Sequence, residues 1–475
     1  MKALLCGKPD LAKIIANKMT SLRELEDISM GLSKRSLRFD SVMKAKWDGF
    51  GRKIVENAVL RALSEANSAG IHHDSFHQAY WRSLYQNAQN RTAPPVLPAE
   101  LTLNRNSRVL CSVTKEALYQ SDGGLRNVIG HLKHQPRTMG KNKAKVFEYG
   151  LSEMKGLVDT NPRYRAERTD VIQQPYPRNS AGIFNRPISL GRRPKTTFSG
   201  RWMDYSNQFG GNPPRRGYST TFVDFANNRV GGGCFNPKRG DVQEEQLVRR
   251  CPELAILLGH FNPSRHHHQL HTRTPIDGDQ EQGKYAHAGS ANPLLFTNLR
   301  FLLGQGDEAA KTTDIKSRQN YDASLAYRTV PNAPPVNVVA VAAPELRNQD
   351  RGMPYSMRLI RDFYGNAFSA FELAKSHDQT SGKRTQIVTG RLGAGAFGHN
   401  LNMSTALQYL AARLAGVDDI KFTGIDAATA AELGNTVFSW VDRKIEEASR
   451  NGETAEDILQ DLSTYSREQG WVTAA

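Results

Sequence analysis

The chain has 475 residues and a formal charge of +16, with 39% hydrophobic and 23% charged residues. This length predicts two or three domains, and the composition excludes wholesale disorder. The four cysteines lack CxxC spacing, no run of eighteen apolar residues occurs, and the first residues lack a long apolar run. These features argue against a disulfide scaffold, a zinc ribbon, a membrane span and a secretory signal.

The N-terminal part of the chain predicts helices. Charged and apolar residues recur at helical spacing from about residue 10 to 90, up to the proline-rich segment APPVLPAEL. We therefore expect a mainly helical accessory region over residues 1–150. Within it, KHQPRTMGKNKAK carries five cations and no acid, which predicts a solvated basic loop and one place for contact with a polyanion.

The rest of the chain, residues 151–475, predicts a second domain with its core from about residue 190. A stretch rich in Pro, Asn, Arg and Gly comes first and predicts irregular connections. The strand-like segments TTFVDFA, VNVVAVAA, TQIVTG and IKFTG then alternate with helices that start near Gln243 and Ser404. This alternation predicts an α/β domain with a mixed sheet covered by helices on both faces.

The first glycine loop follows TTFVDFA and contains Gly231, Gly232 and Gly233. Three glycines let the backbone approach a ligand closely, although a flexible hairpin loop is the alternative. Asp241 and Glu244 have the spacing of a capping box at the start of a helix that runs to about Leu254. We therefore expect Glu244 to act as the reciprocal cap and Glu245, about 100° around the helix, to face the glycine loop.

The second glycine loop, residues 389–398, lies between a strand and a helix. Such a turn offers backbone amides and a positive helix end to an anion, so it predicts a phosphate loop. Gly393, Gly395 and Gly398 also match the dinucleotide fingerprint, with Asp418 about twenty residues further on. A Rossmann-type oxidoreductase is therefore an alternative, although the loop comes late in the chain and Asp418 precedes the strand IKFTG.

The segments VDFANNRVGGG, QEE and TGRLGAGAFG, together with the terminal TAEDILQDLSTY, resemble the poly(ADP-ribose) glycohydrolase family in content and order. The resemblance covers about residues 190–475. It implies a macrodomain-like mixed sheet sandwiched by helices. It also implies a hydrolase that cleaves ADP-ribosyl O-glycosidic linkages, in ADP-ribose chains or on ADP-ribosylated protein, and releases ADP-ribose without a metal or cofactor. A reader that binds ADP-ribose without cutting is the alternative, and the QEE segment favours the enzyme.

The resemblance also implies a role for each site residue. Glu245 would be the catalytic acid and Glu244 its companion. Asp224 and Asn227 would hold the distal ribose region, the ring of Tyr285 would stack on adenine, and the second loop would wrap the diphosphate. The ligand-contacting residues implied are Asp224, Asn227, Gly231, Gly232, Gly233, Gln243, Tyr285, Gly393, Gly395, Ala396 and Phe397.

The sequence departs from the family pattern at two places. Nine residues, 234–242, separate the glycines from Gln243, slightly more than is usual, and Ala394 stands where the family often has cysteine. The backbone amides would bind the phosphate, so the alanine should be tolerated.

Histidines gather at residues 265–271 and at His73 and His77. They lack carboxylate or cysteine partners at ordered spacing, so an exposed loop is favoured over a metal site. We expect a cytoplasmic protein, with delivery into another cell as the alternative.

Overall fold

The computed structural model describes residues 108–121, 123–134, 138–173, 181–200, 215–226, 230–237, 242–261, 270, 272, 292–305, 321–330, 332–344, 346, 351–395 and 397–473. The helical region expected over residues 10–90 lies outside these ranges, as do the histidines singled out in the sequence. Among the predicted site residues, Asn227, Tyr285 and Ala396 also lie outside the described part.

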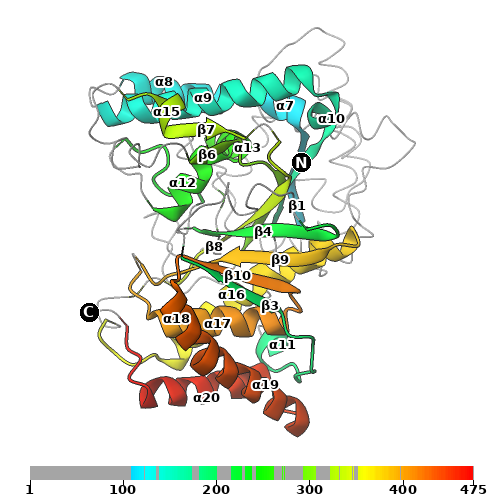
Figure 1. Ribbon diagram of the computed structural model, residues 1–475, viewed down its shortest axis with the longest axis vertical. Coiled ribbons are helices and arrows are strands. Elements are labelled where there is room, and N and C mark those ends of the chain that lie inside the picture. Colours follow the sequence, from blue (N-terminus) through cyan, green and yellow to red (C-terminus); the bar gives the residue numbers. More distant parts are fainter. Residues whose placement is uncertain are drawn as a thin grey trace, which may run out of the picture.

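A mixed eight-stranded sheet forms the centre of the described part (Figure 1). Its strands follow the order β1-β2-β5-β8-β4-β9-β10-β3. Neighbours from β8 to β3 pair in parallel, whereas β1, β2, β5 and β8 pair antiparallel. In sheet order, the strands are β1 (Arg108–Thr114), β2 (Arg168–Gln173), β5 (Leu294–Leu299), β8 (Val336–Val341), β4 (Tyr218–Phe225), β9 (Arg384–Thr389), β10 (Asp419–Thr423) and β3 (Lys195–Ser199).

Helices cover both faces of the sheet, as the alternating pattern predicts (Figure 1). One layer, with the small ribbon β6 (Leu303–Gln305) and β7 (Tyr327–Thr329), contains α7 (Lys115–Gln120), α8 (Gly123–His134), α9 (Thr138–Thr160), α10 (Pro162–Ala166), α12 (Gln243–Arg250), α13 (Pro252–Phe261) and α15 (Ala323–Ala326). The other layer contains α11 (Ala181–Phe184), α16 (Met357–Thr380), α17 (Leu401–Leu414), α18 (Ala427–Glu432), a π-helical turn (Leu433–Phe438), α19 (Ser439–Asn451) and α20 (Ala455–Glu468).

The central strands are apolar on both faces because successive side chains enter different cores. In β4, Phe222 belongs to the core beneath α8, α9 and α13, whereas Val223 belongs to the core beneath α16, α17 and α20. Val338 and Val339 of β8 divide in the same way. Parallel strands that are covered on both sides carry apolar residues at successive positions, and these adjacent apolar pairs made the segments recognisable in the sequence.

Residues 108–150 are part of the same folded unit as the rest of the described chain. Strand β1 pairs with β2, and α9 continues without a break through residue 150, where the sequence predicts the domain boundary. The expected basic loop is wrong, because α8 ends at His134 and α9 begins at Thr138. The side chain of Lys143 in this stretch is fully buried.

The helix expected from Gln243 to about Leu254 consists of two helices. Helix α12 ends at Arg250, and α13 begins at Pro252. Proline has no backbone N–H and fits the first position of a helix, so Pro252 starts a new helix instead of continuing the old one. None of the described helices combines the length and apolar character needed to cross a membrane.

Candidate functional site

The two glycine loops leave the same edge of the sheet. Strands β4 and β9 are adjacent and parallel, with Phe222 opposite Val388, so the chain after each strand emerges at the shared carboxyl edge. A side chain on Gly390 would lie 3.5 Å from the ring of Phe225. This edge is where open α/β sheets bind ligands.

The Gln243 side chain fixes the end of β4. Its amide oxygen accepts a hydrogen bond from the Phe225 N–H at 2.8 Å, and its amide nitrogen donates to the Val223 carbonyl at 2.8 Å. These two bonds hold the backbone on both sides of Asp224. A glutamine supplies both a donor and an acceptor, which explains the residue type required here.

The Asp224 carboxyl group is fully buried, and neither of its oxygens has a hydrogen-bond partner in the described part of the chain. Burial removes the water that stabilises the carboxylate, which raises the pKa of Asp224 to about 8. At neutral pH this group is therefore mainly a protonated acid, which can donate a hydrogen bond. Buried polar groups without partners are rare in proteins and occur at binding sites.

Glu244 holds the first glycine loop. Its Oε1 accepts a hydrogen bond from the Gly231 amide at 2.5 Å. Gly231 and Gly232 have φ values of 93° and 45°, in the region that favours glycine, and a Cβ on Gly232 would overlap Oε2 of Glu244. The loop therefore needs glycine at position 232 for two reasons, its backbone conformation and the neighbouring carboxylate.

The expected capping role of Glu244 is wrong. Helix α12 begins one residue later than the capping-box spacing predicts, with Val242 as its N-cap and no side-chain cap bond. The hydrogen bond that Glu244 accepts from the Gly231 amide instead links it to the first glycine loop. Asp241 lies outside the described residues.

Glu245 is buried in the first turn of α12. Its side chain is 3% exposed, and its Oε2 has no hydrogen-bond partner within the described ranges. The site thus brings together two buried carboxyl groups with unpartnered oxygens, Asp224 and Glu245, beside a glycine loop.

The ends of the second glycine loop are fixed by close packing. A Cβ on Gly390 would lie 2.7 Å from the Thr423 carbonyl, and one on Gly393, whose φ is 70°, would lie 2.8 Å from Ala343 and from His399. The hydroxyl of Ser404 donates to the Leu392 carbonyl at 2.6 Å. The backbone is therefore held in one path where the loop leaves β9.

The middle of the second loop is open. Gly395 is exposed, and a Cβ there would meet no atom within 4 Å, whereas the neighbouring Phe397 packs partly against the core. The first amides of α17 already donate to the Asn400 side chain. The amides of Ala394 and Gly398 also donate within the loop, each at 3.0 Å, so the exposed backbone at Gly395 itself is the part of the loop open to an anion.

His399 is a residue of the site that the sequence reasoning missed. Its Nε2 lies 2.6 Å from the Pro344 carbonyl, just beyond β8, and its Nδ1 lies 3.4 Å from the hydroxyl of Tyr355. The same hydroxyl accepts a hydrogen bond from the Asn400 amide at 2.7 Å. His399 therefore ties the loop after β9 to the segment after β8, and its place directly after the last glycine was the only signal.

The Rossmann alternative fails at Asp418. Its Oδ2 accepts hydrogen bonds from Lys375 at 2.6 Å and from the Thr385 amide at 2.9 Å. Thr385 lies at the start of β9, so Asp418 occupies the edge of the sheet opposite the glycine loop. The acid of a dinucleotide fold follows the second strand on the ligand side, which is not the case here.

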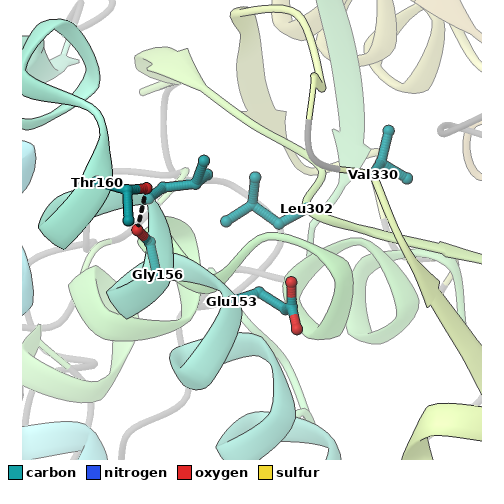
Figure 2. A pocket seen from close by; sticks show the side chains of 6 residues that line it. Glu153, Gly156, Thr160, Leu302 and Val330 are labelled. Atoms are coloured by element: carbon teal, nitrogen blue, oxygen red, sulfur yellow. Dashed lines mark hydrogen bonds between the residues drawn. The ribbon is translucent and has the colours of Figure 1, made fainter.

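Two surface hollows lie away from these loops. The first has a volume of about 200 Å³ and is lined by Glu153, Gly156, Leu157, Thr160, Leu302 and Val330 (Figure 2). The second, of about 500 Å³, lies around Lys145 and Tyr321. Neither contains a predicted site residue, and no cluster of metal-ligating side chains occurs in the described part of the chain.

The comparisons with known proteins give structural neighbours only. No model of a known protein family matches the sequence, and no curated protein matches it. The structure is similar to a poly(ADP-ribose) glycohydrolase from Thermomonospora curvata, with a TM-score of 0.32 and 15% identity over 54% of this chain and 80% of that chain. For a Deinococcus radiodurans poly(ADP-ribose) glycohydrolase in complex with ADP-ribose, the TM-score is 0.34 and the identity 13%, over 53% of this chain and 87% of that chain.

Proposed function

We propose that this chain hydrolyses ADP-ribosyl O-glycosidic linkages and releases ADP-ribose, with Glu245 as the catalytic acid and base. The observation that carries the proposal is the buried Glu245 carboxyl, with one unpartnered oxygen, at the sheet edge from which both glycine loops leave. The order of the two loops and the QEE segment, which resembles the glycohydrolase family, supports the same activity. In this proposal the sheet and its two helical layers form a macrodomain-like unit.

The chemistry requires one proton donor near the scissile bond. Cleavage of the ribosyl C–O bond develops positive charge at the anomeric carbon, and the leaving oxygen takes a proton from Glu245. The Glu245 carboxylate then removes a proton from water, whose oxygen bonds to the anomeric carbon. The substrate's own diphosphate stabilises the positive charge on the ribose, so a second flanking carboxylate is not needed.

The other residues hold the substrate in place. The backbone of the second loop around Gly395 binds the diphosphate, and Phe397 packs beside it. The first loop, held by Glu244, approaches the ribose. The protonated Asp224 carboxyl group supplies a hydrogen-bond donor. Because it is uncharged, it does not repel the anionic ligand as a carboxylate would.

The test compares wild type with Glu245→Gln in two measurements. Release of ADP-ribose is followed with ADP-ribose chains and with ADP-ribosylated protein as separate substrates, and ADP-ribose binding is followed by calorimetry. We expect the glutamine variant to bind but to lose turnover, because an amide keeps the shape but cannot transfer the proton. Glu468→Gln, an exposed change on α20, is the matched control and should behave as wild type.

The possible results of this test distinguish a hydrolase from a protein that only binds ADP-ribose. Turnover in Glu245→Gln at the wild-type rate removes Glu245 from its role. Binding by wild type without hydrolysis of either substrate makes the protein a reader of ADP-ribose. A wild type that neither binds nor hydrolyses refutes the proposed function.

A further inference from the structure

Lys143 is a fully buried lysine that the proposed chemistry does not use. It lies in α9, in the layer opposite α16 and α17, inside the basic stretch expected to be solvated. Its neighbours Lys141 and Lys145 are exposed. A buried ammonium group costs much free energy unless it is paired or hydrogen-bonded, so its surroundings indicate why it is there.

The ammonium group of Lys143 binds the first glycine loop. Its Nζ donates to the carbonyls of Gly233 at 3.2 Å, Cys234 at 3.3 Å and Asn236 at 2.5 Å. An ammonium group has three donors and no acceptor, which suits a turn whose carbonyls converge. The contact joins residues about ninety positions apart in the chain.

The loop is thereby held between opposite charges. Lys143 binds its carbonyls, whereas the Glu244 carboxylate accepts from its Gly231 amide at 2.5 Å. The turn itself contains bonds from the Cys234 amide to Gly231 and from the Asn236 amide to Gly233, both 2.8 Å long. Because charged partners make the stronger hydrogen bonds, the cation and the anion fix the loop more than these internal bonds do.

Helix α9 makes a second contact with the same turn. Phe147, one helical turn after Lys143, packs its ring 5.3 Å from that of Phe235 at an angle of 47°. The face of α9 that carries both residues therefore supports the loop with a polar and an apolar contact.

We propose that Lys143 is a positioning residue of the candidate site, which sets the path of residues 231–236 against Glu244. The proposal rests on the proposed function for its effect on turnover, but not for its effect on the loop. Without the ammonium group, the carbonyls of the turn lose their common partner, and the glycine backbone is free to take other conformations. The ribose-binding side of the site is then misplaced, although Glu245 and its helix remain.

The test compares Lys143→Met with wild type in turnover and in hydrogen exchange of the amides of residues 230–236. Methionine keeps the length and apolar stem but has no donor. Displacement of a catalytic group by about 1 Å can cost a factor of about 10² in rate, so we expect a fall in kcat of about 10–100-fold at saturating substrate. We also expect faster exchange of the Gly231 amide, with the amides of α13 unchanged.

Two further variants separate positioning from general stability. Lys143→Arg keeps a cation with several donors and should recover part of the kcat. Lys145→Met is the matched control, because Lys145 lies two residues on in α9, is exposed, and donates to the Tyr321 carbonyl at 2.8 Å, away from the glycine loop. It should keep the wild-type kcat and loop exchange. A merely structural role for Lys143 would lower the melting temperature of Lys143→Met while leaving its kcat unchanged.

A wild-type kcat together with wild-type exchange of the loop in Lys143→Met overturns the proposal. If this variant does not fold, Lys143→Gln takes its place, since its amide retains two donors without the charge. If the wild type has no hydrolase activity, the proposed function fails, and the exchange measurement still decides whether Lys143 fixes the loop.

Discussion

The carboxylate of Glu244 occupies the space that a side chain on Gly232 would need. The Gly232→Ala change should therefore destabilise the protein in two ways. A positive φ costs an alanine about 1–2 kcal/mol, and the methyl group must in addition displace Glu244. We expect lower stability in urea unfolding and a lower rate of ADP-ribose release, because Glu244 then loses its bond to the loop.

Gly382 provides the control for this substitution. Its φ is 64°, but a Cβ there would meet no atom within 4 Å. The Gly382→Ala change should cost only the conformational part, about 1–2 kcal/mol, and leave turnover at the wild-type level. Equal destabilisation and equal turnover in the two alanine variants would show that the close approach of Gly232 to Glu244 affects neither the stability nor the activity of the protein.

The two glutamates of α12 should respond differently to loss of their charge. Glu244→Gln keeps a carbonyl oxygen for the Gly231 amide, so we expect most of the turnover to remain. Glu244→Leu leaves that buried amide without its partner, at a cost of about 1–3 kcal/mol, and should lower both stability and turnover. Steady-state kinetics and thermal unfolding of both variants measure these effects. Loss of all turnover in Glu244→Gln, with unchanged binding, would give Glu244 the role assigned to Glu245.

The sequence predicted the central strands well because their signal is local. Strand β8 is apolar except for Asn337, β4 and β9 contain the adjacent apolar pairs Phe222-Val223 and Ile387-Val388, and the glycines mark the turns that follow β4 and β9. Strands β1 and β2 were missed. Each is mixed in polarity, and the two strands pair with one another across more than fifty residues of chain.

Contacts between distant segments explain the other differences. Nothing in the residues around Lys143 distinguishes it from Lys141 or Lys145, because its burial depends on three carbonyls in a loop about ninety residues later. Glu244 likewise accepts a hydrogen bond from the Gly231 amide of the glycine loop, a contact that the spacing of the capping box does not predict. His399 contacts Pro344, and this contact depends on the sheet order, in which β8 and β9 both run parallel to β4, the strand between them.

The two central glycines of the second loop should separate folding from binding. Gly393→Ala would bring a methyl group to 2.8 Å from Ala343 and His399 at a positive φ, so we expect reduced stability. Gly395→Ala meets no protein atom and should fold as wild type, but its methyl group would narrow the opening proposed for the diphosphate. A tenfold loss of ADP-ribose affinity, about 1.4 kcal/mol, is the expected calorimetric result for Gly395→Ala. Wild-type affinity in that variant would place the diphosphate elsewhere.

The buried Asp224 carboxyl should make stability depend on pH. Its pKa is raised from the ordinary 3.8 to about 8, so the folded protein keeps a proton that the unfolded chain releases. Its contribution to the free energy of unfolding is complete below about pH 4 and is lost as the pH rises to about 8, by up to about 1.4 kcal/mol per pH unit. Asp224→Asn stays neutral and loses nothing over this range. In urea unfolding, the variant should therefore gain on wild type from pH 5 to pH 8 and no further above it.

Asp378 supplies the comparison that identifies the group responsible. Burial raises the pKa of Asp378 only to about 6, and its carboxyl oxygen Oδ1 accepts a hydrogen bond from Asn337. The advantage of Asp378→Asn over wild type should therefore stop growing near pH 6, two units earlier than that of Asp224→Asn. If the Asp224→Asn advantage is the same at pH 5 and pH 8, the Asp224 carboxyl is ionised in the folded protein. It would then act as an acceptor in the site instead of a donor.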